Sequence, residues 1–357
     1  MPERIIKCNE AIKEATDQMM AVDPSVFVIG LGVSYKNGAD GTTAGLKAKY
    51  PERIFDVPVS EAGFTGMAVG AAISGLRPIV HHGRIEFALL ASDFIFTQAA
   101  KWNYMFGGDN PVPVVFRIAI GRAWGNGPQH TLSTYSMFGN VPGLKVVIPS
   151  TPYMAKGLLV SALRDRNPVV FLEPRYSYAM KQHVPEEIYS EPLDKAKVFR
   201  TGKSVTVVAY GDGFIGALQA CELLNAVNGN GTATADLADI DLIDLVSINP
   251  VDHETIARSV QKTGHLLCID TTIDSFSVGS EIIAKVAQNT AVHLKKPPVA
   301  LACPNVACPT STALTESYYP TKVDIANAIL ALQGKPAITH PLTFDDLHTH
   351  AAFVIQG

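Results

Sequence analysis

PVSEAGFTGMAVG, residues 58–70, is the stretch that decides the fold of this chain. It overlaps the end of a strand-like run from Arg53 to Val59, and its single acid, Glu61, precedes small residues and glycines at close intervals. Small residues on a helix face let two backbones approach closely, so the stretch predicts a tightly packed helix. A carboxylate between a strand and such a helix lies at the C-terminal edge of a sheet, where open α/β folds bind ligands. The alternative interpretation is an acid that is favoured by the dipole at the helix N-terminus.

Short apolar runs alternate with helical patterns through the first half of the chain. The first run, Val26 to Gly30, predicts a buried parallel strand because it is apolar and ends in glycine. Helices are expected at residues 1–20 and 87–104, and further strands at residues 79–81, 112–120, 146–149 and 168–172. Strands that alternate with helices indicate the α/β class, with a doubly wound parallel sheet.

The second half repeats this alternation after a polar, irregular segment at residues 178–202. Its expected strands are residues 205–209, 240–246 and 265–269, and its expected helices are residues 213–226, 252–263 and 278–288. The small, polar run 228–238 predicts a surface loop. We therefore expect two doubly wound α/β domains at residues 1–185 and 203–340, a linker at 186–202 and a C-terminal tail at 341–357.

The composition argues against several classes of protein. Of 357 residues, 47% are hydrophobic and 17% are charged, and the formal net charge is −4. The absence of a basic cluster argues against a nucleic-acid partner. The polar N-terminus does not have the pattern of a signal peptide, and no apolar run reaches membrane-spanning length. Five cysteines without a C-x-x-C pair indicate reduced thiols in a cytoplasmic protein.

Several ordered motifs carry a resemblance that spans residues 26–332. The chain resembles the beta subunit of the thiamine-diphosphate-dependent decarboxylase component of 2-oxoacid dehydrogenase complexes, in the transketolase-like superfamily. Pyruvate, branched-chain and acetoin dehydrogenases share this subunit type. The motifs besides residues 58–70 are GLRPIV (75–80), QAAK (98–101), QH (129–130), PGLKVVIP (142–149), AKGLL (155–159) and RDRNP (164–168). The resemblance implies a transketolase-like pyrimidine-binding domain followed by a transketolase C-terminal domain.

The same resemblance implies roles for three residues. Glu61 matches the family's glutamate, which binds the aminopyrimidine of the coenzyme and activates it; an apolar pocket would keep a proton available to such a carboxyl group. Phe87 matches the aromatic residue that stacks on the aminopyrimidine ring. His130 matches the loop histidine that faces the reacting carbons, where it can donate to a carboxylate or move protons. As a rule, a phenylalanine opening a helix is a core residue, and a lone histidine in a glycine-rich loop is a surface residue.

The chain contains no magnesium-diphosphate motif. Gly211-Asp212-Gly213 begins like one, but it falls in the second domain, where relatives have a similar turn without metal. No P-loop or G-x-G-x-x-G replaces it. The resemblance therefore implies that magnesium and the diphosphate are held by an alpha-type partner subunit, with two copies of each chain in an alpha2beta2 complex.

Asp165 and Asn167, with the backbone around Ala162 and Val114, match a structural potassium site of some relatives. Oxygen ligands suit a hard cation. Asp-Arg-Asn-Pro is also good turn chemistry, so a helix C-cap followed by a turn is the alternative interpretation.

The chain departs from many relatives beside the coenzyme pocket. His81 replaces a glutamate, His82 replaces an apolar or aromatic residue, and Arg84 lies in a run that is usually more apolar or amide-bearing. These three residues are candidates for binding an anionic or polyhydroxy substrate, and drift at a subunit contact is the alternative. Residues 30–32 lack a common acid, and Arg122-Ala123-Trp124-Gly125 makes the His130 loop bulkier than usual.

The function expected from this resemblance is decarboxylation of a 2-oxo acid, with transfer of the acyl or aldehyde unit to a lipoyl group or another acceptor. The second domain would form the beta–beta contact and offer a docking face for a lipoyl acyltransferase core. Two alternatives remain open: a split transketolase-like enzyme that moves a two-carbon unit between sugars, favoured by His81, His82 and Arg84, and a non-catalytic scaffolding paralogue. The substrate and acceptor do not follow from the sequence.

Overall fold

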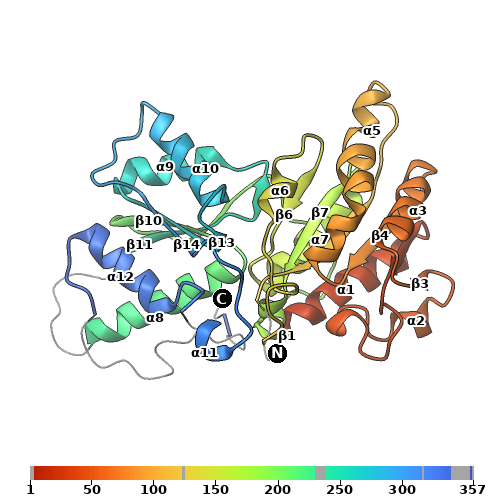
Figure 1. Cartoon of the computed structure of the whole chain (residues 1–357), viewed down its shortest axis with the longest axis horizontal. Helices are drawn as coiled ribbons and strands as arrows, with labels where there is room; N and C mark the ends of the chain where they lie inside the picture. The colour runs from red at the N-terminus through yellow and green to blue at the C-terminus, as the bar shows by residue number, and fades with distance from the viewer. Residues whose placement is uncertain (1–3, 123–124, 230–238, 316, 339–353, 356–357) are drawn as a thin grey trace.

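The structure is a computed structural model that describes residues 4–122, 125–229, 239–315, 317–338 and 354–355. Figure 1 shows two α/β units side by side, the first formed by the N-terminal half of the chain and the second by the C-terminal half. Within the described residues, no helix is long and apolar enough to span a bilayer. The predicted loop at 228–238 and the predicted tail at 341–357 fall largely outside the described residues.

The first unit contains a seven-stranded sheet in the order β12-β6-β7-β5-β4-β2-β3. All neighbouring strands are parallel except β12, which runs antiparallel to β6. The strands are β2 (Val26–Gly30), β3 (Ile54–Asp56), β4 (Arg77–His82), β5 (Val115–Ile120), β6 (Lys145–Val147), β7 (Val169–Pro174) and β12 (Ser247–Asn249). Most of these strands are nearly continuous apolar runs, because helices cover both faces of a parallel sheet.

Helices form a layer on each face of this sheet. On one face α3 (Glu61–Ile73) packs against the side chain of Val80, and on the other α1 (Cys8–Val22) and α7 (Pro152–Arg164) cover the side chain of Ile79. Adjacent residues of β4 therefore point into opposite layers, as the pleat of a strand requires. Short helices α2 (Leu46–Lys49), α6 (Ser136–Gly139) and the 3₁₀ turns η1 (Ala39–Gly41) and η4 (Arg175–Ala179) lie in the connections.

Two helical predictions in this unit need correction. The N-terminal helix begins at Cys8, because residues 5–7 form strand β1, which pairs antiparallel with β8 (Lys181–His183). The segment predicted as one helix at 87–104 consists of four short pieces. These are α4 (Ile85–Ala88), the 3₁₀ turn η2 (Leu89–Ala91), the π-helical segment η3 (Asp93–Ala99) and α5 (Ala100–Met105). Sequence periodicity shows that a segment is helical, but it does not show which hydrogen-bond register the helix adopts.

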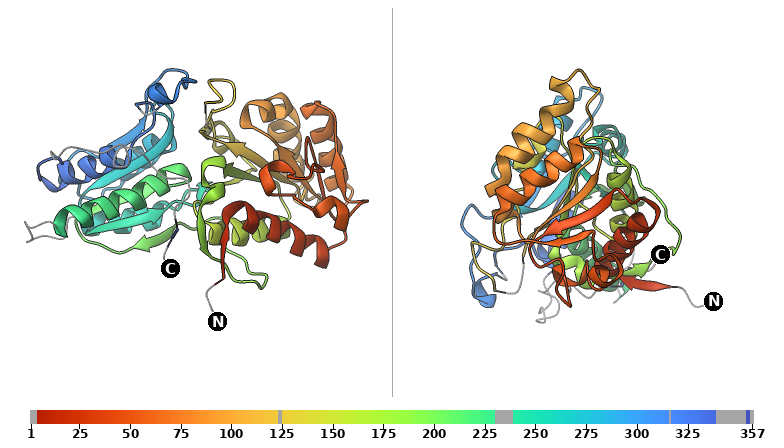
Figure 2. Two further views of the ribbon diagram at one scale, coloured as in Figure 1. Left: turned by 90° about the horizontal axis from the view of Figure 1, so that it is seen from below. Right: turned by 90° about the vertical axis from the view of Figure 1, so that its right-hand side faces the viewer.

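The second unit contains a five-stranded sheet in the order β14-β13-β10-β11-β9. Helices α8 and α12 cover one face, and α9 and α10 cover the other (Figure 1); Figure 2 shows green α8 beside blue α12. The elements are β9 (Lys197–Arg200), β10 (Val205–Ala209), α8 (Asp212–Gly229), β11 (Ile240–Asp244), α9 (His253–Thr263), β13 (Leu266–Ile273), α10 (Val278–Gln288), β14 (Val299–Cys303), α11 (Thr312–Thr315) and α12 (Lys322–Gln333). Only the edge strand β9 is antiparallel, so this sheet is doubly wound as predicted.

The sheets do not divide the chain where the predicted linker lies. Residues 197–200, inside the expected linker 186–202, form β9, which pairs with β11 as an edge strand of the second sheet. Strand β12 follows β11 in the chain and yet pairs with β6 of the first sheet. One apolar core cluster contains residues of both units, including Ile148 and Val208. The polar composition that suggested a linker is that of an exposed edge strand.

Candidate functional site

Glu61, Phe87 and His130 lie after three strands of the first sheet, at its C-terminal edge. Glu61 follows β3, Phe87 follows β4 and His130 follows β5, and all three strands are parallel to β2 or to each other. The chain leaves β2 toward β3 on one side and leaves β4 toward β5 on the other. Such a reversal opens a crevice outside the carboxyl ends of the strands, and this crevice is the usual ligand site of open α/β sheets.

Glu61 is the first residue of α3, and only 8% of its surface is exposed. Within the part of the chain that the structure describes, its carboxylate accepts no hydrogen bond. The helix dipole favours a negative charge at this position. Its oxygens are therefore free to accept a hydrogen bond from a ligand group.

Phe87 and His130 contact each other edge to face, with ring centroids 5.4 Å apart and planes at 79°. The His130 backbone N–H donates to the Gly127 carbonyl at 3.2 Å. Sequence analysis missed Glu86, whose Oε1 accepts the Leu132 N–H at 2.7 Å. Glu86 is the residue before Phe87, so one helical turn supplies both the aromatic ring and the anchor of the histidine loop.

His81 and His82 lie on opposite faces of β4. His82 faces α3, where its Nε2 lies 3.2 Å from the Thr65 hydroxyl and its ring packs on Phe64 at a centroid distance of 5.2 Å. Burial lowers the pKa of His82 to about 3 and that of His81 to about 4, so both rings are neutral at pH 7. The structure does not bring the two imidazoles together as one anion-binding surface.

A buried ion pair lies beside His81 on the α1 side of the sheet. Arg117 Nη2 donates to Glu173 Oε2 at 2.9 Å, and a second bond joins Arg117 Nε to Oε1. Neither side chain has any exposed surface, and the Tyr178 hydroxyl also donates to Glu173 at 2.7 Å. The Arg117 guanidinium holds the pKa of Glu173 below its usual range in spite of burial. Sequence analysis missed this pair, because its members lie on different strands of a nearly continuous apolar sheet.

Arg84 precedes α4 and is almost fully buried. Burial, and next the positive charge of Arg175, lower the pKa of its guanidinium. Its Nη1 has no hydrogen-bond partner among the described residues. The Nδ1 atoms of His81 and His82 also lack a partner among the described residues, but both rings are neutral. Of the three residues predicted to bind substrate, Arg84 is therefore the one that offers a positive charge to an anion, and that role stays a prediction.

The residues of the predicted potassium site form a turn after α7. Asp165 accepts the Asn167 N–H at 2.9 Å through Oδ1, and its other oxygen bonds to Lys145 Nζ. Arg77 Nη1 donates to the Asp165 carbonyl at 2.9 Å. The Asn167 side-chain oxygen accepts the Asn103 amide at 2.9 Å. The carbonyls of Ala162 and Val114 accept the N–H groups of Asp165 and Val169. These contacts favour the turn interpretation, and potassium stays a prediction.

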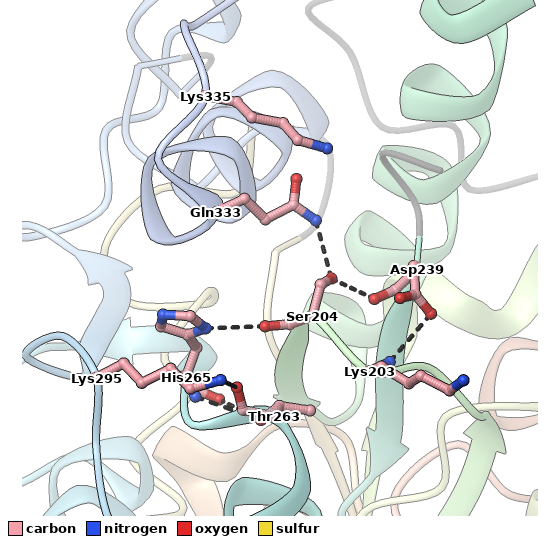
Figure 3. Close-up of a pocket in the computed structure, with 8 residues that line it drawn as sticks. All are labelled: Lys203, Ser204, Asp239, Thr263, His265, Lys295, Gln333 and Lys335. Carbon is pink, nitrogen blue, oxygen red and sulfur yellow. Dashed lines mark hydrogen bonds between the residues drawn. The ribbon is translucent and has the colours of Figure 1, made fainter. Parts of the chain in front are cut away.

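Two hollows do not include Glu61, Phe87 or His130 in their lining. One, of about 460 Å³, is an apolar groove against α3 and β3 that includes Phe55 and Met67. The other, of similar volume, lies where strands of the second sheet begin (Figure 3). There His265 Nδ1 donates to the Ser204 carbonyl at 2.9 Å, and Lys295 Nζ donates at 3.0 Å to the carbonyl of Thr263, the last residue of α9. Ligands of parallel sheets bind at the opposite end of the strands from this second hollow, and the first hollow lies apart from the three predicted site residues. We therefore do not assign either hollow to the chemistry.

Comparison with known proteins identifies the two domains and the family. The transketolase pyrimidine-binding domain matches residues 5–181, and the transketolase C-terminal domain matches residues 194–325. The chain is 38% identical over 335 residues to the beta subunit of an acetoin:2,6-dichlorophenolindophenol oxidoreductase of Cupriavidus necator, covering 91% of this chain and 96% of the relative. The chain belongs to the beta-subunit family of pyruvate and acetoin dehydrogenases. The family predicted from the sequence is thus confirmed.

Other beta subunits of the family are about as similar. The pyruvate dehydrogenase E1 component subunit beta-2 of Oryza sativa subsp. japonica is 39% identical over 325 residues, covering 90% of this chain and 84% of the relative. A solved split-gene transketolase, described as an inactive beta4 tetramer, superposes with a TM-score of 0.72 at 20% identity, covering 92% of this chain and 98% of that one. This likeness confirms the fold class, with two transketolase-like domains.

Proposed function

We propose that the chain is the beta-type subunit of a heteromeric thiamine-diphosphate enzyme that decarboxylates a 2-oxo acid and passes the acyl or aldehyde unit to a lipoyl group or another acceptor. The observation that carries the proposal is the position of Glu61, a largely buried residue whose carboxylate has no hydrogen-bond partner among the described residues, at the C-terminal edge of a transketolase-type sheet. The proposal is supported by the relatives, which are beta subunits of pyruvate and acetoin enzymes.

The residues at this edge fit the aminopyrimidine half of the coenzyme. When bound, the coenzyme supplies a carbon nucleophile and an electron sink for decarboxylation. Glu61 would accept or share a hydrogen bond with a ring nitrogen of the coenzyme. The half-exposed ring of Phe87 offers a flat surface for stacking, and His130, in edge contact with Phe87, handles protons and the substrate carboxylate.

The proposal requires a second kind of chain. An alpha-type partner would hold the diphosphate and magnesium, because no phosphate-binding motif occurs in this sequence. We further propose an alpha2beta2 assembly in the cytoplasm and a lipoyl acyltransferase core as the acceptor-bearing partner.

The split-transketolase alternative has less support than the sequence suggested. It rested on His81, His82 and Arg84 as donors spread along a sugar phosphate, but the two histidines are neutral, buried and on opposite faces of β4. A panel of pyruvate, branched 2-oxo acids, acetoin and ketose phosphates separates the two reactions directly.

Replacement of Glu61 by glutamine tests the proposal. Glu61→Gln keeps the size and polarity of the side chain but loses its acid–base function, so turnover should fall by about 10²–10⁴-fold in the complex with its partner. Glu52→Gln, which removes an exposed acid before β3, is the matched control and should keep parental turnover. Near-parental activity of Glu61→Gln, with coenzyme and partner present, would refute the assignment.

A further inference from the structure

The loop that carries His130 is closed at its base by contacts of the first unit. Gly121, directly after β5, donates its N–H to the Leu132 carbonyl at 3.0 Å, and Leu132 in turn donates to Glu86 at 2.7 Å. Residues 121 and 132 therefore form the neck of the loop. His130 lies two residues before the end of this neck, so a shift of the neck moves the imidazole.

The second unit contributes a charge to this neck. Asp212, the first residue of α8, is 3% exposed, and its carboxylate faces Gly121. A Cβ at Gly121 would lie 2.9 Å from Asp212 Oδ2, and the φ angle of Gly121 is +80°, so glycine is required there on both grounds. This close approach joins the Gly211-Asp212-Gly213 turn, which holds no coenzyme motif, to the loop of the other unit.

Arg122, the next residue along the neck, contacts side chains of both units. Its Nε lies 3.8 Å from Asp212 Oδ2. Its guanidinium lies 4.0 Å from the ring centroid of Tyr176 in the first unit and 5.0 Å from that of Tyr319 in the second. Stacking of a planar guanidinium between two aromatic rings fixes its position. Thr310 of the second unit packs directly against Gly127, farther along the loop.

Few groups other than Arg122 stabilise the negative charge of Asp212. Neither carboxylate oxygen has a hydrogen-bond partner among the described residues, and the same holds for Arg122 Nε and the Ser133 hydroxyl. Burial raises the pKa of Asp212 to about 6, and Arg122 opposes that rise. The other titratable groups that face it are the uncharged Tyr176, Tyr319 and Cys303. A buried ion pair with few hydrogen bonds is weak evidence for stability, so a positional role is the better explanation for it.

We propose that Asp212 and Arg122 are positioning residues, through which the second domain holds the neck of the loop and sets the place of His130 at the reacting atoms. This inference rests on the proposed function of His130, and it gives the C-terminal domain a part in catalysis besides subunit contact. The inference depends on two residues of this chain, Arg122 at the neck and Asp212 at the start of α8.

The test uses the assembled complex with its alpha-type partner, magnesium and coenzyme. The variants are Asp212→Asn, Arg122→Gln and the double variant. A misplaced catalytic group costs up to about 10²-fold, so each single variant should lose roughly 10-fold or more in turnover with little change in KM. The double variant should be no slower than the slower single variant, because both changes release the same contact.

Two further measurements separate positioning from stability. Hydrogen exchange of amides at residues 125–132 should quicken in both single variants. The turnover of the parent should fall below about pH 6, where Asp212 takes up a proton, and Asp212→Asn should lack this fall. The control is Asp241→Asn, which removes another buried carboxylate of the second domain, paired with Lys262 Nζ at 2.7 Å. The control should lose stability but not turnover.

The possible results discriminate among the explanations. Parental turnover and parental loop exchange in Arg122→Gln, a half-buried position that tolerates polar change, would overturn the inference, even if Asp212→Asn failed to fold. An equal loss of turnover in Asp241→Asn would also overturn it, because general destabilisation would then suffice. If Glu61→Gln were fully active, the proposed function would fail instead, and loop exchange alone would still decide whether Asp212 holds the neck.

Discussion

At the scale of single residues, burial and nearby partners determine which carboxyl groups have shifted pKa values. Glu173 stays ionised because Arg117 binds it with two hydrogen bonds, whereas Asp244 is buried with weaker support. Asp244 Oδ1 accepts the Ser150 hydroxyl at 2.7 Å and the Val246 N–H at 3.3 Å. Burial outweighs these bonds and raises the pKa of Asp244 to about 7.

This shift predicts a pH dependence of stability. The folded-state pKa of Asp244 lies above its unfolded value, so the folded chain binds more protons than the unfolded chain between about pH 4 and pH 7. The free energy of unfolding therefore falls as the pH rises through that window. Asp244→Asn removes this contribution, so its stability relative to the parent should improve by roughly 3 kcal/mol between pH 5 and pH 8.

Urea denaturation of both proteins at the two pH values measures this difference. The comparison cancels other titrating groups, such as His81 and His82, whose lowered pKa values act in the opposite direction. If the free energies of unfolding of Asp244→Asn and the parent differed by the same amount at pH 5 and at pH 8, the pKa of Asp244 would not be raised, and the prediction would be wrong.

At the scale of elements, helix α3 depends on one glycine much more than on another. A Cβ at Gly66 would lie 2.7 Å from two ring atoms of Phe94 in the π-helical segment, whereas a Cβ at Gly70 would meet nothing within 4 Å. The close contact that residues 58–70 predict is therefore made at Gly66 within this chain. Gly70, one turn farther along the same side of the helix, faces open space in this chain.

The two glycines form a matched pair for mutation. Gly66→Ala should lower the free energy of unfolding by about 1–3 kcal/mol, because the methyl group displaces Phe94. Gly70→Ala should raise it by about 0.5–1 kcal/mol, since alanine favours a helix interior over glycine. Thermal unfolding of the isolated variants measures both effects. Equal effects of the two substitutions would mean that helix propensity, not the Phe94 contact, dominates.

At the scale of the whole molecule, the two units share a core, and in the proposed function they form only part of an active site. Strand β12 and a shared apolar cluster join the units. The second half of the chain therefore contributes packing contacts to the first sheet. In the proposed function, Glu61, Phe87 and His130 serve only the aminopyrimidine side of the coenzyme. The diphosphate side needs donors or magnesium that this sequence does not provide in any recognised motif.

The isolated chain should therefore bind thiamine diphosphate weakly. Calorimetry with magnesium and coenzyme should give little heat for this chain alone and a clear, saturable isotherm once the alpha-type partner is added. Thiamine diphosphate interacts mainly through its charged diphosphate, so loss of that half removes most of the affinity. Tight, stoichiometric binding by the chain alone would refute the split-site arrangement.

The sequence by itself determined the class of fold, the positions of most strands along the chain and the place of Glu61 after a strand. Alternating apolar runs and helical patterns indicate parallel strands, and Glu61 follows such a strand, whereas Phe87 and His130 were named through the family resemblance. The motifs also carried the family. These features depend on residues that are close together in the chain.

Only the tertiary structure decided the features that depend on distant residues. The Arg117–Glu173 pair, the contact of Asp212 with the neck at Gly121 and Arg122, and the pairing of β12 with β6 each join segments that are far apart in the chain. No local pattern of polarity or spacing encodes such a pairing, because packing in three dimensions selects the partner. Burial, which sets the pKa values of Asp212, Asp244, His81 and His82, is likewise a property of the folded molecule and not of the sequence around each residue.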